Sequence, residues 1–165
     1  YKGIECLLEL VKRTPDIQYV VAGKADDSVK ETIDALKKLP NVKLDEGVIP
    51  YSKMHDYFYN ALCTVLPYET ATQSGVVLDA YKHSRPAVAF DVGALGEQIE
   101  EGKTGYLAKS GNVEQLEAQL RKIIDMPREQ YEQMCKQSYQ KGLDAYSAKS
   151  REKEFLSAIG VDLGV

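Results

Sequence analysis

Tryptophan is absent from this 165-residue chain, cysteine occurs only three times and histidine twice, and the formal net charge is only −4. The three cysteines cannot all pair and lie in apolar patterns, which indicates buried thiols in a reducing compartment. No histidine has a cysteine or a second histidine at ligand spacing, so we expect no metal site. The basic residues are scattered rather than grouped, which argues against a nucleic-acid partner.

Long apolar segments are also lacking. No run approaches the ~20 residues of a membrane-spanning helix, and no signal peptide is recognisable, so we expect a cytoplasmic location. Familiar catalytic fingerprints are missing too: there is no Gly-x-Ser-x-Gly elbow, no Walker A motif, no Gly-x-Gly-x-x-Gly turn and no Ser/His/Asp or Cys/His set. The sequence therefore does not belong to the commonest hydrolase and dinucleotide-binding classes.

What the chain does have is a regular alternation of helical and strand patterns. Helical spacing of apolar residues, as in Ile4 to Val11 and Met54 to Ala61, alternates with short apolar runs such as Ile17 to Ala22 and Leu62 to Leu66. The runs are continuous, which predicts strands covered on both faces of a parallel sheet. We predict one α/β domain over residues 1–165, with a Rossmann-like parallel sheet flanked by helices.

The most informative segment lies between Leu66 and Ala80, where an apolar run ends at a proline and a helical pattern begins at Ser74-Gly75. A sharp strand-to-helix turn directs unpaired backbone N–H groups and a partial positive charge at the space above it, and so binds phosphate. Asp79, one turn later, has the chemistry to accept hydrogen bonds from a sugar diol. Two simpler readings stay open: Ser74 as a plain N-cap, and Asp79 as an exposed acid.

Three further segments are candidates at the same edge of the sheet. Lys2 stands at the start of the first helix, where an ammonium would neutralise a diphosphate. The loop Gly47-Val48-Ile49-Pro50 offers backbone groups and apolar contact to a base, although an ordinary loop explains it equally well. The paired acids Asp26-Asp27 are similar to those of receiver domains, but a solvated helix start is the simpler interpretation.

In chain order, these segments resemble the C-terminal, donor-binding domain of the retaining family 4 (group 1) glycosyltransferases, which have the GT-B fold. The resemblance spans nearly the whole chain, and it depends on the ordered set rather than on one motif. The matching segments are Tyr1-Lys2-Gly3-Ile4-Glu5, Val20-Val21-Ala22-Gly23, Gly47-Val48-Ile49-Pro50, Ser74-Gly75 to Asp79-Ala80, Arg85-Pro86-Ala87-Val88-Ala89 and Lys103-Thr104-Gly105-Tyr106-Leu107.

The resemblance implies transfer of a hexose from a nucleotide-diphosphate sugar to a glycan or lipid acceptor, in polysaccharide biosynthesis. Lys2 and the Ser74-Gly75 amides would stabilise the leaving diphosphate, and Asp79 would fix the ribose. No cofactor is implied, because the nucleotide sugar is a substrate, and no metal is implied, because the family holds the diphosphate with basic groups and a helix terminus. The implied catalytic residues are Lys2 and Asp79, and the implied donor-binding residues are Gly47, Val48, Thr72, Gln73, Ser74, Gly75 and Asp79.

The chain departs from the family pattern at its signature, two glutamates eight positions apart. The second falls on Asp79 and the first on Ala71, whose side chain accepts no hydrogen bond, although Glu69 lies two residues away. We interpret this as an altered contact with the donor sugar. The alternative is a non-catalytic nucleotide-binding or interaction module that keeps the same fold.

The resemblance also implies parts that lie outside these residues. The acceptor would bind an N-terminal domain, and the family's first strand, central in the sheet, would precede Tyr1. Without that strand the sheet must close the gap, borrow a strand or expose its edges. We expect the 165-residue fragment to be inactive on its own, and the full-length protein to contact the inner face of a membrane peripherally.

Overall fold

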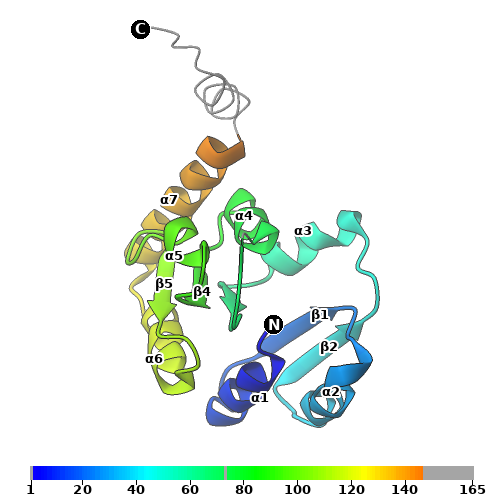
Figure 1. The fold of residues 1–165 in the computed structure, drawn as a ribbon. Helices are drawn as coiled ribbons and strands as arrows, with labels where there is room; N and C mark the ends of the chain where they lie inside the picture. Colours follow the sequence, from blue (N-terminus) through cyan, green and yellow to red (C-terminus); the bar gives the residue numbers. More distant parts are fainter. Residues whose placement is uncertain (1, 73, 147–165) are drawn as a thin grey trace, which may run out of the picture.

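The structure is a computed structural model that describes residues 2–72 and 74–146. Parallel strands alternate with helices along this part of the chain (Figure 1), which confirms the predicted Rossmann-like α/β class. The strands are β1 (Tyr19–Gly23), β2 (Val42–Glu46), β3 (Thr64–Leu66), β4 (Ala87–Phe90) and β5 (Gly105–Ala108). The helices are α1 (Ile4–Arg13), α2 (Lys30–Lys37), α3 (Tyr51–Tyr59), α4 (Gly75–Lys82), α5 (Leu95–Gln98), α6 (Val113–Ile124) and α7 (Arg128–Tyr146), with a short 3-10 helix η1 (Asp27–Val29).

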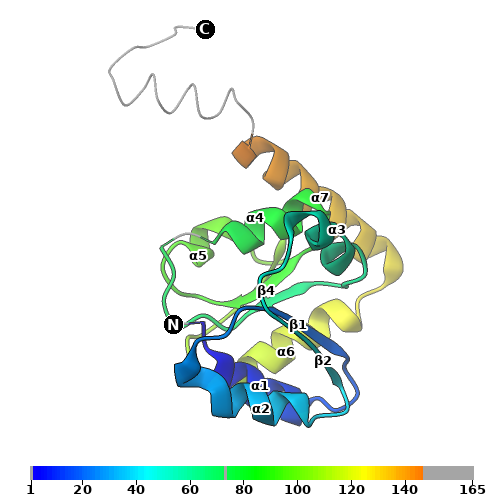
Figure 2. The same cartoon turned by 90° about the vertical axis from the view of Figure 1, so that its right-hand side faces the viewer.

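The helices form a layer on each side of the strands. Figure 2 shows α1, α2 and α6 on one side and α3, α4, α5 and α7 on the other. Strand β4 is buried along its whole length, with Val88 and Phe90 in one apolar cluster and Ala87 and Ala89 in the other. Burial on both faces is why this strand reads as a continuous apolar run.

The strands form two separate parallel sheets rather than one. Strand β1 pairs with β2, and β3, β4 and β5 pair in that order. Burial alternates along β1, and Val20 is 56% exposed. The prediction of strands covered on both faces therefore holds for β4 and is wrong for β1, whose second face is only partly covered.

An open edge on β1 follows from its hydrogen-bond pattern. The Tyr19 N–H donates to Asn41 O at 2.8 Å, and the Gly23 carbonyl accepts from Gly47 N–H at 3.0 Å. Because successive residues of a strand alternate between its two edges, the backbone groups of Val20 and Ala22 point away from β2. No strand of the described residues pairs with that edge.

Two other sequence expectations concern thiols and membrane spans. All three cysteines are free, but only Cys135 is buried, whereas Cys6 and Cys63 are half-buried. Burial raises the pKa of the Cys63 thiol to about 12. Among the described helices, none is both long and apolar enough to cross a membrane.

Candidate functional site

The turn from β3 into α4 forms as the sequence predicts, with Gly75 as the first helical residue. Ser74 is the N-cap residue by backbone position (φ −116°, ψ 109°), yet its side chain makes no capping hydrogen bond. Ser74 is only 4% exposed, and among the described residues its hydroxyl oxygen has no hydrogen-bond partner. Ser74 is therefore the N-cap residue, as the simpler interpretation predicts, but it does not cap with its side chain: its buried hydroxyl stands at a helix N-terminus, where the first N–H groups lack intrahelical partners.

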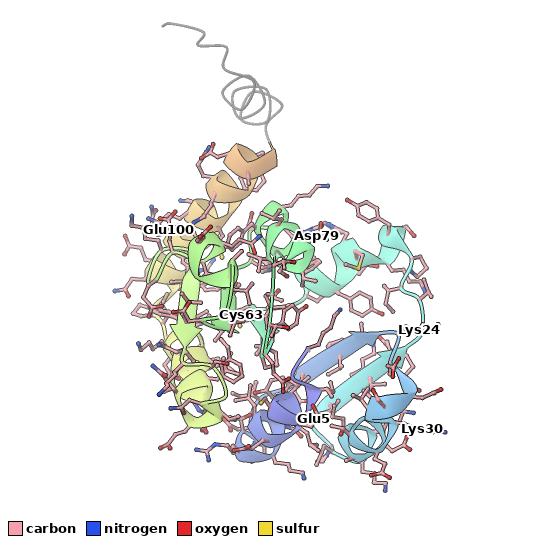
Figure 3. The ribbon with its side chains drawn as sticks, viewed as in Figure 1. Glu5, Lys24, Lys30, Cys63, Asp79 and Glu100 are labelled. Atoms are coloured by element: carbon pink, nitrogen blue, oxygen red, sulfur yellow. The ribbon has the colours of Figure 1, made fainter. Side chains whose placement is uncertain are left out.

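Space is available beside this turn. A β-carbon built on Gly75 would meet no heavy atom within 4 Å, so a ligand group can approach the backbone of the first helical turn closely. Asp79 is half-buried and lies four residues after Gly75, on the same face of α4. Figure 3 shows the position of Asp79 on α4.

The backbone of Ser74 is held by a residue that the sequence analysis missed. The Ser74 N–H donates to Gln98 Oε1 at 3.1 Å, and Gln98 Nε2 donates to the Ser74 carbonyl at 3.3 Å. The Ser74 amide, which we expected to face the diphosphate, is thus already bonded. No sequence pattern links two residues 24 positions apart, so only the three-dimensional structure identifies Gln98.

The loop after β4 packs against Ala71, the residue that replaces the first glutamate of the family pattern. A β-carbon on Gly93 would lie 1.7 Å from the Ala71 carbonyl oxygen, which accepts a hydrogen bond from Ala94 N–H at 3.3 Å. The Ala71 side chain packs against the apolar cluster around Leu66. Position 71 therefore contributes a packing contact in this chain. Glu69 and Thr72 are both exposed nearby, and Gln73 lies outside the described residues.

Lys2 lies beside the same loop. Gly3 takes a left-handed conformation (φ 61°) at the start of α1 and packs against the Pro67 carbonyl. The Lys2 ammonium lies 5.9 Å from the centre of the Tyr68 ring. The fold thus brings the start of α1 next to the β3–α4 loop, 65 positions away along the chain.

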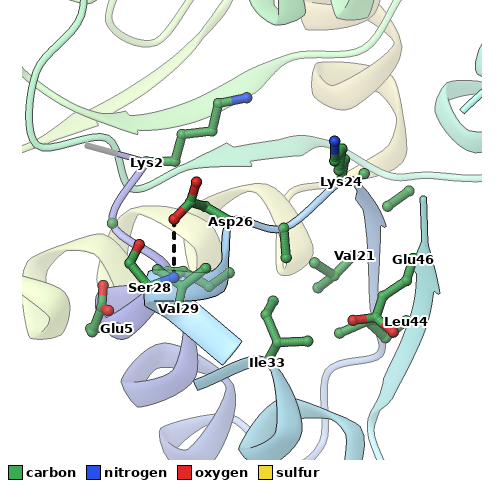
Figure 4. Close-up of a pocket in the computed structure, with 15 residues that line it drawn as sticks. Lys2, Glu5, Val21, Lys24, Asp26, Ser28, Val29, Ile33, Leu44 and Glu46 are labelled. Atoms are coloured by element: carbon green, nitrogen blue, oxygen red, sulfur yellow. Dashed lines mark hydrogen bonds between the residues drawn. The ribbon is translucent and has the colours of Figure 1, made fainter. Parts of the chain in front are cut away.

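A cavity of about 530 Å³ opens at this point (Figure 4), between the start of α1 and the C-terminal ends of β1 and β2. Lys2 and Lys24 line it together with Glu5, Asp26 and Glu46. Two of these acids have partners: Asp26 accepts from Ser28 N–H at 3.0 Å, which lowers its pKa, and Glu46 pairs with Lys37 at 2.7 Å. Asp26 therefore starts the 3-10 helix η1, as the simpler interpretation of the paired acids predicts.

The predicted base-binding loop, residues 47–50, directly follows the C-terminal end of β2. Gly47 has φ 122° and donates its N–H to Gly23, which lines the cavity, while Val48 is 83% exposed. Neither Gly47 nor Val48 lines the cavity itself, and neither do Ser74, Gly75 and Asp79. Of the predicted residues that the structure describes, only Lys2 lines the cavity, and Lys2 and Gly3 lie against Tyr68 and Pro67 of the loop that leads to Ser74. Within residues 2–72 and 74–146, no cluster of three or more His, Cys, Asp and Glu side chains is arranged to hold a metal.

The fold matches solved glycosyltransferases of the GT-B type. Sucrose-phosphate synthase from Thermosynechococcus elongatus superposes with a TM-score of 0.81 at 20% identity, covering 96% of this chain and 42% of that one. HepE from Anabaena, solved in complex with UDP-glucose, gives a TM-score of 0.81 at 17% identity, covering 96% and 46%. At these identities the likeness shows a shared fold.

Sequence comparison extends this likeness to a family. The model of the glycosyl transferases group 1 matches residues 1–141, and the chain belongs to this family. It is 28% identical over 127 residues to the sulfoquinovosyl transferase SQD2 of Arabidopsis thaliana, covering 74% of this chain and 24% of the relative. An α-D-kanosaminyltransferase of Streptomyces kanamyceticus is 26% identical over 128 residues, covering 75% and 32%. The chain spans about a quarter to a third of the length of these relatives.

Proposed function

We propose that this chain is the C-terminal, donor-binding domain of a retaining glycosyltransferase, which moves a hexose from a nucleotide-diphosphate sugar to a glycan or lipid acceptor. The observation that carries the proposal is the unbonded, buried Ser74 hydroxyl at the open N-terminus of α4. Leaving a buried polar group unbonded costs about 1–3 kcal/mol. A phosphate oxygen at this turn would supply the partner and complement the helix terminus.

The remaining site residues have roles that fit this ligand. The Gly75 and Val76 amides and the Lys2 ammonium would stabilise the negative charge that develops on the diphosphate as the sugar leaves. Asp79, on the Gly75 face of α4, would accept hydrogen bonds from the ribose hydroxyls. Gly47 and Val48 would border the base, Thr72 and Gln73 would contact the donor sugar, and the nucleotide sugar would need no cofactor.

The comparisons support a uridine nucleotide as the first ligand to try. Anabaena HepE was solved with UDP, with UDP and glucose, and with UDP-glucose. The acceptor, a cytoplasmic location and a peripheral membrane contact belong to the proposal for the full-length protein.

A second candidate function is a nucleotide-binding module without transfer activity. Ala71 favours it, because a half-buried methyl group that packs against an apolar cluster stands where the family pattern has an acid. The two candidates differ in turnover rather than in nucleotide binding, so hydrolysis or transfer of UDP-glucose by the full-length protein separates them.

Calorimetric titration of this chain with UDP, GDP and ADP tests nucleotide binding, which both candidate functions require. We expect one nucleotide to bind, and Asp79→Asn to weaken it about tenfold, the equivalent of about 1.4 kcal/mol. Asp125→Asn, at the exposed end of α6, makes the same chemical change elsewhere and should leave binding unchanged. Equal losses in the two variants, or silence with all three nucleotides, would rule out the proposed donor site.

A further inference from the structure

We propose that Gln98 is a positioning residue for the diphosphate turn, and that it acts through the backbone of Ser74. This inference rests on the function proposed above and assigns it one further residue. A single side chain bonds both the N–H and the carbonyl of Ser74, at 3.1 Å and 3.3 Å. An amide side chain is suited to this because it carries a donor and an acceptor side by side.

The two bonds fix the residue from which α4 starts. Ser74 has extended backbone angles, and Gly75 begins the helix directly after it. Rotation of the Ser74 peptide would redirect the following amides, which are the donors that the proposed function assigns to the diphosphate. Gln98 therefore sets the direction in which the first turn of α4 presents its N–H groups.

Gln98 is itself held by the core. Its carbonyl accepts a hydrogen bond from the Tyr81 hydroxyl at 3.1 Å, and its N–H donates to Ala94 O at 3.0 Å. Tyr81 is fully buried, and its hydroxyl also bonds Thr104 Oγ1 at 2.7 Å. We call the pair of hydrogen bonds between the Gln98 side chain and the Ser74 backbone the clamp. The backbone of Gln98 is in turn bonded to Tyr81 of α4, so the clamp is held at both ends.

The clamp also decides which groups remain for a ligand. Because Gln98 Oε1 takes the Ser74 N–H, the polar group of Ser74 still without a partner is its hydroxyl. A carboxylate at position 98 would still accept from the Ser74 N–H. It would lose the bond to the carbonyl and bring a negative charge to an anion site.

Titration of this chain with UDP tests the clamp, using Gln98→Leu, Gln98→Glu and a matched control, Gln133→Glu, at an exposed position of α7. Loss of both bonds in Gln98→Leu should weaken UDP binding roughly tenfold. In Gln98→Glu the loss relative to wild type at the same pH should be larger at pH 8 and should shrink as the pH falls through about 4.3, because a protonated carboxyl again carries a donor and an acceptor. The affinity of Gln133→Glu relative to wild type should not depend on pH in this way, and a purely structural defect at position 98 would not produce the recovery.

Hydrogen exchange at the Ser74 amide gives a readout that needs no ligand. It should be faster in Gln98→Leu than in wild type, with circular dichroism confirming that both are folded. UDP binding by wild type that is unchanged in both Gln98 variants would overturn this inference and leave the proposed function standing. Wild-type silence with UDP, GDP and ADP would overturn both, and unchanged Ser74 exchange would show that the clamp does not order the turn.

Discussion

Gly3 and Pro67 are in van der Waals contact through their backbones: a β-carbon on Gly3 would lie 1.7 Å from the Pro67 carbonyl oxygen. The contact joins the start of α1 to the end of β3, two elements that supply different parts of the proposed site. Gly3 also has φ 61°, so both its conformation and its lack of a side chain are needed here.

We predict that Gly3→Ala destabilises the protein more than the same change at Gly111. Both glycines have left-handed angles, φ 61° and 73°, but a β-carbon on Gly111 would meet nothing within 4 Å. The shared conformational cost is ~1–2 kcal/mol, and the clash at Gly3 should add ~1–3 kcal/mol. Urea unfolding of both variants measures the difference, and equal losses would contradict the contact. UDP affinity should fall only in Gly3→Ala, because it displaces Lys2.

Ser74→Ala should change stability and binding in opposite directions. Removing an unbonded buried hydroxyl should leave the ligand-free protein as stable or more stable by up to ~1 kcal/mol, while UDP binding falls roughly tenfold. The control is Ser138→Ala, because Ser138 is fully buried but donates to Thr104 O at 3.4 Å. It should lower stability and leave UDP affinity unchanged. A melting temperature that falls in Ser74→Ala would show that its hydroxyl has a partner in solution.

Tyr81→Phe should weaken both the fold and the nucleotide site. The Tyr81 hydroxyl bonds Thr104 Oγ1 and the Gln98 carbonyl in a fully buried environment, and burial raises its pKa. Its removal should cost ~1–2 kcal/mol of unfolding free energy and lower UDP affinity by loosening Gln98. Tyr51→Phe is the control and should change neither quantity. Tyr51 is 70% exposed, and its hydroxyl accepts a hydrogen bond from the exposed Lys82 ammonium. Unaltered stability in Tyr81→Phe would refute the buried network.

The ion pair between Asp16 and Arg121 predicts a defined pH dependence. Arg121 donates to both carboxylate oxygens, at 2.5 Å and 2.8 Å, and holds the Asp16 pKa at about 2, below its usual 3.8. A lowered folded-state pKa gives stability that is present above pH 3.8 and is lost as the pH falls towards 2. The melting temperatures of wild type and Asp16→Asn should therefore differ at pH 7 and converge near pH 2. In an Arg121→Gln background the difference at pH 7 should be smaller, because the backbone hydrogen bond that also lowers the Asp16 pKa remains.

The sequence predicts those features that depend on neighbours along the chain. The start of α4 at Gly75 follows from a strand, a proline and a small polar loop in succession, and these lie within 14 residues. The burial of β4 follows from its continuous apolar run. The fold class follows from the alternation of such segments, because each one must bury its own apolar face.

The features that the sequence does not predict depend on contacts between distant segments. The hydrogen bonds of Gln98 to Ser74 need α5 and α4 to be placed first. The exposure of Val20 depends on which strands pair, and its apolar neighbours in Tyr19 to Ala22 give no sign that one face is open. The position of Lys2 depends likewise on the Gly3–Pro67 contact.

The two separate sheets have a consequence for any solution experiment on this chain. Thr64 N–H donates to Pro86 O at 3.0 Å, so Val65, like Val20 and Ala22, directs its backbone groups to an edge that no described strand covers. Such edges pair with extended polypeptide from other molecules, so we expect a concentrated sample to self-associate. Nucleotide affinity should be measured over a range of protein concentrations and extrapolated to the dilute limit, where each molecule meets the ligand alone.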